Sequence, residues 1–391
     1  MTVEGHVEVG FERVREAFEK QFADGEHVGA SVSAYLRGNL VVNLWGGTTA
    51  PDGGDPWREE TMTTVYSTTK AFTATSLHVL ADRGLVQYDD LVSKYWPEFA
   101  QNGKDKITVY HLLTHQVGIP QMPDDIALDD VTDWSTMVSA IERLSPEWEP
   151  GTDTGYHALD FGWLIGELVR RIDGRSVGTF LHDEISKPLG LKKLFLGAPE
   201  SEEPNIAQLY SPPRTPEQSA LAKAFIASGS ITARAMGGTM HSDDRNLQDV
   251  LNSREGHASE IPAVSGVMCA RDLARFYACL ANYGELDGVR ILSEATVRRM
   301  SAPQSHRPDR VLIIPIRWSM GYMNGGAAGW PQGPRETSFG HPGAGGSVGF
   351  ADPEIGMAFG FVPNLILQDM IGAVRGGALA HVARECVAKA S

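Results

Sequence analysis

Apolar and polar positions alternate with a helical period close to the start of the chain. Over residues 9–22 the apolar side chains recur every three to four positions, which predicts an amphipathic helix. Two runs rich in β-branched and aromatic residues follow, at 30–36 and 40–45, separated by the turn Arg37-Gly38-Asn39. Two such runs around a Gly-Asn turn predict a β-hairpin.

A longer helical pattern then occupies residues 67–83, and Gly84 is placed to end it. From residue 85 to residue 195 the pattern is mainly helical, most clearly over 107–114 and 156–172. Residues 196–225 contain five prolines and predict an irregular segment that could cover a site or be a plain surface excursion.

The last part of the chain returns to short β-type runs after a further helical pattern at 266–283. The predicted strands cover 310–318, 347–351 and 357–362, and a final helix is expected over about 365–389. Strands at both ends with helices between them favour one sheet built from both chain ends.

The same pattern divides the chain into two predicted units. Residues 1–84 and 293–391 would form the α/β domain, and 85–292 would form a mainly helical domain that includes the Pro-rich loop. A length of 391 residues with 42 % hydrophobic content is compatible with about two domains.

Composition excludes several classes of function. A formal net charge of −15 argues against a nucleic-acid partner, because phosphate binding needs an excess of Lys and Arg. The three cysteines (Cys269, Cys279, Cys386) form no CxxC pair, which fits a reducing compartment and excludes a cysteine-built zinc site. The longest aliphatic run, 311–316, is too short to span a bilayer, and the N-terminus does not resemble a signal peptide. We therefore expect a soluble cytoplasmic protein without a membrane partner.

The first candidate for chemistry is the Ser67-x-x-Lys70 motif at the start of the long predicted helix. A spacing of three places Ser67 Oγ and Lys70 Nζ on one helical face. A desolvated lysine can activate a serine, and the Ser67 N–H is one of the free donors of a first helical turn. Alone, the motif is equally consistent with a capping serine and a solvated lysine.

Two further segments change this interpretation. A Pro-Gly loop delivers Tyr156 just before a predicted helix, and a glycine-dense turn at 339–347 contains His341-Pro342-Gly343. With this order of motifs the chain resembles the serine β-lactamase-like superfamily, in particular the class C β-lactamase and family VIII carboxylesterase branch. Segments 107–115, 162–167 and 270–276 extend the resemblance over nearly the whole chain.

The resemblance implies a fold and a set of roles. The fold would be the α/β (α+β) serine β-lactamase/D,D-peptidase type, with an antiparallel sheet flanked by helices and a helical insertion. Ser67 would be the acylated nucleophile, and Lys70 would exchange protons with it. Tyr156 would be the general base, as a phenolate or through a shared proton, with its pKa lowered by a positive Lys70. The backbone N–H groups of Ser67 and Ala344 would form the oxyanion hole.

Four other residues are candidates for substrate binding. Gly343 would let its strand approach the substrate closely. Ala158 stands where β-lactamases have Asn, and His341 stands where they have Lys, so both changes favour neutral esters over β-lactams. His341 could still donate a hydrogen bond to Tyr156 or to a substrate carbonyl, or only shape the turn. Trp330 could line an acyl or alcohol pocket, although a core role is the default for a tryptophan.

Two shorter motifs are rejected as sites. Gly345-x-Ser347-x-Gly349 matches a nucleophile elbow, but a turn between strands follows it where a helix is required. His111 and His115 have the spacing of a helical zinc pair, but no catalytic Glu and no third ligand are in register, so we expect them to brace a core helix. No metal or cofactor is implied.

The sequence therefore predicts a serine hydrolase that acts through an acyl-enzyme, with a carboxylesterase on small or short-chain esters as the first expectation. Amide or peptide hydrolysis, β-lactamase action and acyl transfer to another alcohol are alternatives within the fold. A penicillin-binding D,D-peptidase is less favoured, because its substrate lies outside the cell. A non-catalytic binding or assembly protein is the alternative outside the enzyme class. The oligomeric state is left open.

Overall fold

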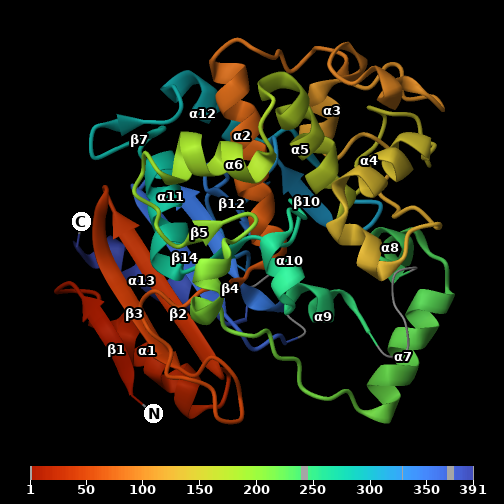
Figure 1. Ribbon diagram of the computed structural model, residues 1–391. Coiled ribbons are helices and arrows are strands. Elements are labelled where there is room, and N and C mark those ends of the chain that lie inside the picture. The colour runs from red at the N-terminus through yellow and green to blue at the C-terminus, as the bar shows by residue number, and fades with distance from the viewer. Residues whose placement is uncertain (1, 239–244, 328, 368–373, 391) are drawn as a thin grey trace.

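The computed structural model describes residues 2–238, 245–327, 329–367 and 374–390. Its centre is a nine-stranded antiparallel sheet in the order β1-β3-β2-β14-β13-β12-β11-β10-β9 (Figure 1). The strands are β1 Val3–Val7, β2 Gly29–Leu36, β3 Asn39–Gly47, β9 Ser305–Pro308, β10 Pro315–Trp318, β11 Met323–Asn324, β12 Phe339–Pro342, β13 Val348–Asp352 and β14 Met357–Pro363. The sheet is thus built from both chain ends, as the sequence predicts.

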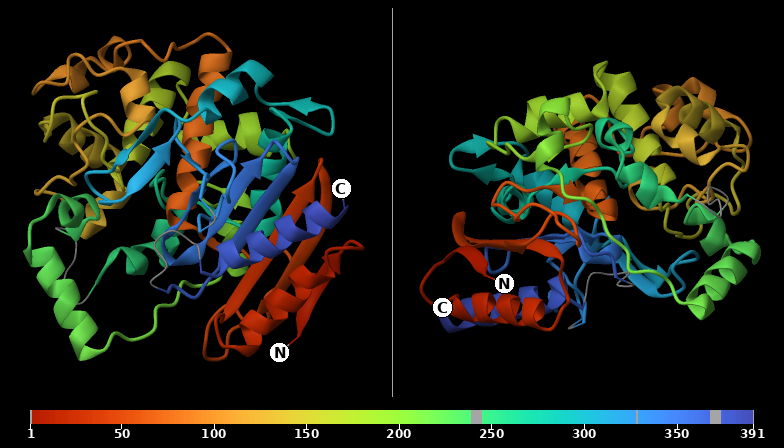
Figure 2. Two further views of the ribbon diagram at one scale, coloured as in Figure 1. Left: turned by 180° about the vertical axis from the view of Figure 1, so that it is seen from behind. Right: turned by 60° about the horizontal axis from the view of Figure 1, so that its bottom comes forward.

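The two ends meet at the pair β2–β14, which runs from Leu36 opposite Met357 to Ala30 opposite Pro363. All residues of β14 and nearly all of β2 are buried, because helices cover both faces of the sheet at this place. Helices α1 (Glu12–Ala23) and α13 (Gly376–Ala390) pack on one face, and α11 (Ala270–Ala281) packs on the other (Figure 2). Gly349 in β13 permits this packing, because a Cβ there would lie 2.3 Å from the Tyr277 ring of α11.

The rest of the chain is mainly helical and surrounds α2 (Lys70–Asp82), of which residues 70–80 are buried. The other helices are α3 Val109–Leu113, α4 Trp134–Arg143, α5 Asp160–Asp173, α6 Val177–Leu181, α7 Pro216–Ala227, α8 Ile231–Ala235, α9 Leu247–Leu251, α10 Arg254–Ala258 and α12 Glu294–Ser301. Short 3₁₀ turns include η1 (Tyr66–Thr69) and η6 (Glu200–Asn205). Two small sheets pair β4 (Thr63–Thr64) and β5 (Leu194–Phe195) with β6 (Val267–Met268), and β7 (Glu285–Leu286) with β8 (Val289–Arg290).

Several predicted boundaries need correction. The pattern at 67–83 is a 3₁₀ turn, η1, followed by α2, and the pattern at 156–172 becomes helical only at Asp160. The predicted strand 310–318 begins at Pro315, since residues 309–314 form the loop of the β9–β10 hairpin. In the predicted helix 365–389, α13 starts at Gly376, and residues 368–373 lie outside the described residues.

The Pro-rich segment is less irregular than expected. Helix α7 begins inside it, because Thr215 and Gln218 form a capping box and Pro216 occupies the first turn, where its missing N–H costs nothing. None of the residues of α7 is buried. Within the described ranges, no helix is long and apolar enough to cross a bilayer.

Candidate active site

Ser67 lies at the junction between the sheet and the helical part of the chain. It sits in η1, directly before α2, and its side chain is half-buried, so that it can be reached from solvent. The residue before it, Tyr66, has a left-handed backbone (φ 47°), which is uncommon for a non-glycine residue and is found often at functional sites. The local backbone therefore holds the Ser67 hydroxyl in a fixed position.

Two of the predicted partners contact this hydroxyl. Lys70 Nζ lies 3.1 Å from Ser67 Oγ, and the Tyr156 hydroxyl lies 2.8 Å from it. Lys70 Nζ also stands 4.9 Å from the centre of the Tyr156 ring. The three residues, which are 89 positions apart in sequence at their extremes, form one hydrogen-bonded cluster.

Lys70 is fully buried, and two backbone carbonyls accept its other hydrogen bonds. Nζ donates to Ala158 O at 2.6 Å and to Ala263 O at 3.2 Å. Burial lowers the pKa of Lys70 well below its usual value, and the carboxylate of Asp160 opposes this only in part. Burial also raises the pKa of Asp160 well above its usual value. Lys70 can therefore lose its proton much more readily than an exposed lysine.

Tyr156 is held by groups far from it in sequence. Its backbone N–H donates to Asp309 Oδ1 at 3.0 Å, and Asp309 Oδ2 accepts from Trp318 Nε1 at 3.1 Å. The Trp318 ring stacks on the Tyr156 ring with a centroid distance of 5.6 Å. Behind the tyrosine, His115 Nδ1 accepts from the N–H of His157 at 3.2 Å. These contacts fix the direction of the phenol.

The electrostatics at Tyr156 differ from the sequence-based expectation. Burial raises the pKa of Tyr156, and its hydrogen bond with Ser67 offsets this only in part. The phenol is thus a hydroxyl near neutral pH, whereas the neighbouring lysine is the group whose pKa falls.

The predicted oxyanion strand does approach the serine. Gly343 follows β12, and a Cβ on it would lie 2.1 Å from Val65 O and 2.2 Å from Ser347 Oγ, so only glycine fits there. Ser347 Oγ donates to Val65 O at 2.7 Å and also contacts the Thr68 hydroxyl, so it tethers the strand to η1. Ala344, the next residue along, is exposed.

His341 is a residue of β12 itself, and its tautomer follows from a hydrogen bond to the backbone. Its Nδ1 is 2.7 Å from the carbonyl oxygen of Pro342, which can only accept, so Nδ1 carries the proton. Burial lowers the pKa of His341 to about 3, so the ring is neutral and Nε2 is a bare acceptor. In the described part of the chain this Nε2 has no partner. A neutral His341 in this tautomer cannot donate to Tyr156 or to a substrate carbonyl through Nε2.

The remaining predicted residues are placed less directly. Ala158 contributes its carbonyl to Lys70, a role the sequence did not suggest. Trp330 lines a pocket of 220 Å³ with Arg317 and Asn324. Arg317 and Trp318 are neighbours in β10, so their side chains point to opposite faces of the sheet. Ser67 does not line this pocket, and the role of Trp330 stays a prediction.

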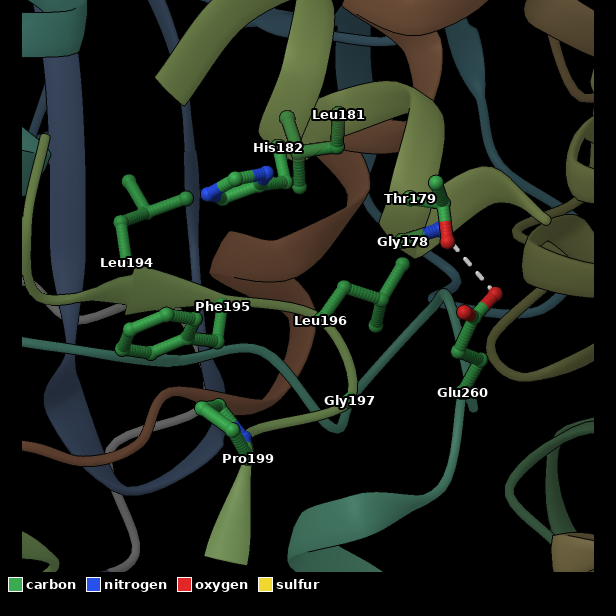
Figure 3. A pocket seen from close by; sticks show the side chains of 10 residues that line it. All are labelled: Gly178, Thr179, Leu181, His182, Leu194, Phe195, Leu196, Gly197, Pro199 and Glu260. Atoms are coloured by element: carbon green, nitrogen blue, oxygen red, sulfur yellow. Dashed lines mark hydrogen bonds between the residues drawn. The ribbon is translucent and has the colours of Figure 1, made fainter. Parts of the chain in front are cut away.

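A second pocket, of 260 Å³, opens beside α6 and β5 (Figure 3). Glu260 lies on its wall, and its carboxylate already accepts from the Ser176 hydroxyl and from the Gly178 N–H. None of the predicted site residues lines this pocket.

The two rejected motifs have structural roles. His111 joins the capping box of α3, where its Nδ1 accepts from the Thr108 N–H at 3.3 Å. Ser347 is followed by strand β13 and not by a helix.

Sequence reasoning missed three residues of the site, namely Asp160, Asp309 and Trp318. Asp160 carried a signal, because a carboxylate between Leu159 and Phe161 on a buried helix needs a reason. Asp309 carried none, since its partner Tyr156 is 153 positions away.

Fold and site together define a serine hydrolase with a Ser-Lys-Tyr cluster. The family is equally clear: the β-lactamase family model matches residues 14–378, and the chain belongs to that family. A Mycobacterium tuberculosis protein called esterase/β-lactamase LipL is 34 % identical over 399 residues, which cover 99 % of this chain and 89 % of that protein.

Three solved structures are similar to this chain over 99–100 % of its length. The crystal structure of a family VIII carboxylesterase shares 34 % identity and a TM-score of 0.89, covering 99 % of this chain and 100 % of its own. EstA from Arthrobacter nitroguajacolicus Rue61a shares 30 % identity and a TM-score of 0.86, with 100 % of both chains covered. A penicillin-binding protein homologue from Caulobacter crescentus shares 33 % identity and a TM-score of 0.87, covering 99 % of this chain and 100 % of that one.

Proposed function

We propose that the protein is a carboxylesterase that hydrolyses small or short-chain esters through an acyl-enzyme on Ser67. The observation that carries the proposal is the contact of Ser67 Oγ with both Lys70 Nζ and the Tyr156 hydroxyl, at 3.1 and 2.8 Å. A serine held between two groups that can exchange protons is the arrangement that acyl transfer requires. A relative named esterase/β-lactamase and a solved structure named family VIII carboxylesterase, both similar over most of their length, support the same function.

The contacts of Lys70 indicate which group takes the serine proton. A neutral amine has two N–H donors and one lone pair. Two carbonyls, of Ala158 and Ala263, take the two donors, so the lone pair is left for the Ser67 hydroxyl. The lowered pKa of Lys70 makes this neutral form accessible. We therefore assign Lys70 as the base and Tyr156 as the proton donor.

The reaction then proceeds in two matched halves. Ser67 Oγ attacks the ester carbonyl while its proton moves to Lys70, and the N–H groups of Ser67 and Ala344 receive the oxyanion. The C–O bond to the alcohol breaks as Tyr156 donates its proton to the leaving oxygen, and Lys70 returns a proton to the phenolate. Water repeats the sequence on the acyl-enzyme, which releases the acid and restores Ser67.

His341 favours esters over β-lactams as substrates. A β-lactam carries a carboxylate, and a cation at this place would hold it. Here the ring is neutral and its free nitrogen is an acceptor, so it offers a carboxylate neither a charge nor a hydrogen bond. Ala158 also lacks the amide that would hold a β-lactam side chain. We expect at most weak β-lactam hydrolysis.

The test combines labelling and a substrate comparison. A fluorophosphonate should add to the wild-type protein, and intact-mass spectrometry should show no adduct on Ser67→Ala. The wild type should hydrolyse p-nitrophenyl butyrate with a much higher kcat/KM than nitrocefin. An unlabelled wild-type protein would indicate a binding protein, and a kcat/KM for nitrocefin that equals the best ester would indicate a β-lactamase.

A cytoplasmic location is part of the same proposal. Cys269, Cys279 and Cys386 are all buried free thiols, which is the usual state in a reducing compartment. Cell fractionation with an antibody against the protein tests this, and recovery from the culture medium or the cell envelope would contradict it.

A further inference from the structure

The loop of the β9–β10 hairpin, residues 309–314, contacts the segment that carries Tyr156 and contains a strained apolar residue, Ile313. Ile313 has φ 62°, a left-handed conformation that is a genuine outlier for a β-branched side chain. Such residues are energetically unfavourable, and they persist where the surroundings or the function require them. Asn or Gly at this position would remove the cost.

The strained residue is also exposed. The side chain of Ile313 is 74 % exposed and that of Ile314 is 41 % exposed, although both are large and aliphatic. A turn that places two adjacent isoleucines in water, one of them in an unfavourable conformation, gains nothing for folding. This combination points to a ligand.

The loop is tied to the segment that carries Tyr156. Asp309 Oδ1 accepts from the N–H of Tyr156 at 3.0 Å and from the N–H groups of Val311 and Leu312 at 2.9 Å. The Arg310 N–H donates to Thr154 O at 3.0 Å. The loop therefore runs directly alongside the segment that carries Tyr156.

The loop is fixed on its other side as well. The Thr232 hydroxyl of α8 donates to Val311 O at 2.6 Å, and Ile313 N donates to Asp309 O at 2.8 Å. Held from both sides, the tip cannot move its isoleucines away from solvent without breaking these bonds.

We propose that Ile313 and Ile314 form an apolar rim of the active site that binds the aliphatic end of the ester substrate. The inference rests on the proposed carboxylesterase function and specifies its substrate: within the small esters, those with a longer aliphatic part are preferred to acetates of small alcohols. Contact with a chain removes the two side chains from water, which gives a physical reason for keeping them there.

The experiment measures how kcat/KM depends on chain length. The variant Ile313→Asn keeps the backbone conformation and removes the apolar surface, and Ile313→Leu keeps the apolar surface. Val9→Asn is the matched control, because Val9 is 93 % exposed and precedes α1 on the far face of the sheet. Each protein is assayed with p-nitrophenyl acetate, butyrate, hexanoate and octanoate.

A buried methylene contributes up to about fourfold to binding. In the wild type we expect kcat/KM to rise from the acetate to longer esters. In Ile313→Asn the acetate value should stay within about twofold while the octanoate value falls by roughly fivefold or more, since part of the chain loses its contact. Ile313→Leu and Val9→Asn should keep the wild-type profile. A second series, acetates of ethanol, butanol, hexanol and octanol, shows whether the rim holds the acyl or the alcohol end.

An equal loss on all chain lengths in Ile313→Asn would overturn the proposal, because it would mean that the loop only positions Tyr156. If Ile313→Asn kept the wild-type dependence on chain length in both series of esters, the proposal would be overturned too. If the wild-type protein hydrolyses no ester at all, the proposed function itself fails, which is a different result from an unchanged profile. A rise in the thermal midpoint of Ile313→Asn checks that the variant folds and that strain was relieved.

Discussion

At the scale of single residues, the important feature is the exchange of properties between Lys70 and Tyr156. Burial lowers the pKa of the lysine and raises that of the phenol. These two shifts are the reason for proposing Lys70 as the base and Tyr156 as the proton donor. Both effects have one cause, since removal from water penalises whichever form is charged.

Tyr156→Phe tests the role of the phenol. The ring remains to pack on Trp318, and only the hydroxyl is lost. We expect the kcat for alkyl esters to fall by roughly 10²–10⁴-fold, as for loss of a general acid, with little change in KM. A p-nitrophenyl ester should lose much less, because p-nitrophenolate leaves without a proton. Equal losses on both substrates would show that Tyr156 takes the serine proton instead.

Lys70→Arg tests whether catalysis needs a lysine that can lose its proton or only a positive charge. Arginine keeps the charge but is not deprotonated in proteins, so it cannot accept the proton of Ser67. We expect activity near background for this variant. In the wild type kcat/KM should rise with pH and level off, because the amine is active only above its lowered pKa. Substantial activity of Lys70→Arg would show that the charge alone is needed.

At the scale of elements, the site depends on how closely β12 approaches η1. Gly343→Ala would place a Cβ 2.1 Å from Val65 O, a distance that real Cβ atoms do not show. Forcing the strand away costs typically about 1–3 kcal/mol. It also displaces the Ala344 N–H, and loss of one oxyanion donor lowers kcat by roughly 10²–10³-fold.

Gly329→Ala is the control for that variant, since its Cβ would meet open space. Chemical denaturation and ester kinetics on both proteins separate the two effects. Wild-type kcat in Gly343→Ala would mean that the strand does not supply an oxyanion donor.

Elements were predictable from sequence where the signal was local. The hairpin at residues 30–45 follows from alternation around a short turn, and β2 and β3 match it closely. Helix α7 was missed because its apolar residues have no buried face, and its capping box is the stronger signal.

The order of motifs located Ser67, Lys70 and Tyr156, which the structure brings into contact. Asp309 could not be found, because nothing local in a turn reveals a hydrogen bond to a distant tyrosine.

At the scale of the whole molecule, buried neutral histidines make stability depend on pH. Burial lowers the pKa of His27, His157 and His341 to about 3 and of His78 to about 4, and it lowers the pKa of His115 as well. The unfolded chain binds protons at these sites below about pH 6.5, whereas the folded chain does not. Stability from these groups is therefore complete above pH 6.5 and is lost as pH falls toward 4.

The size of this effect makes it measurable. Each such histidine lowers the free energy of unfolding by about 2 kcal/mol near pH 5. Together these histidines approach the whole stability of a typical domain. The raised pKa values of Asp160 and Asp309 act in the opposite direction and reduce the sum. Calorimetry at pH 5.5 in two buffers of different ionisation enthalpy should show uptake of at least about two protons on unfolding. Uptake close to zero would contradict the buried neutral histidines.

The pairing of β2 with β14 has a consequence for the synthesis of the protein. Ser67 leaves the ribosome early, but β2 needs a partner strand at 357–363, and the strand that approaches Ser67 is β12, at 339–342. Both are made long after Ser67. A nascent chain, or one stopped by premature termination before β12, contains the nucleophile without its oxyanion strand. Esterase activity therefore requires that translation has passed the β14 strand.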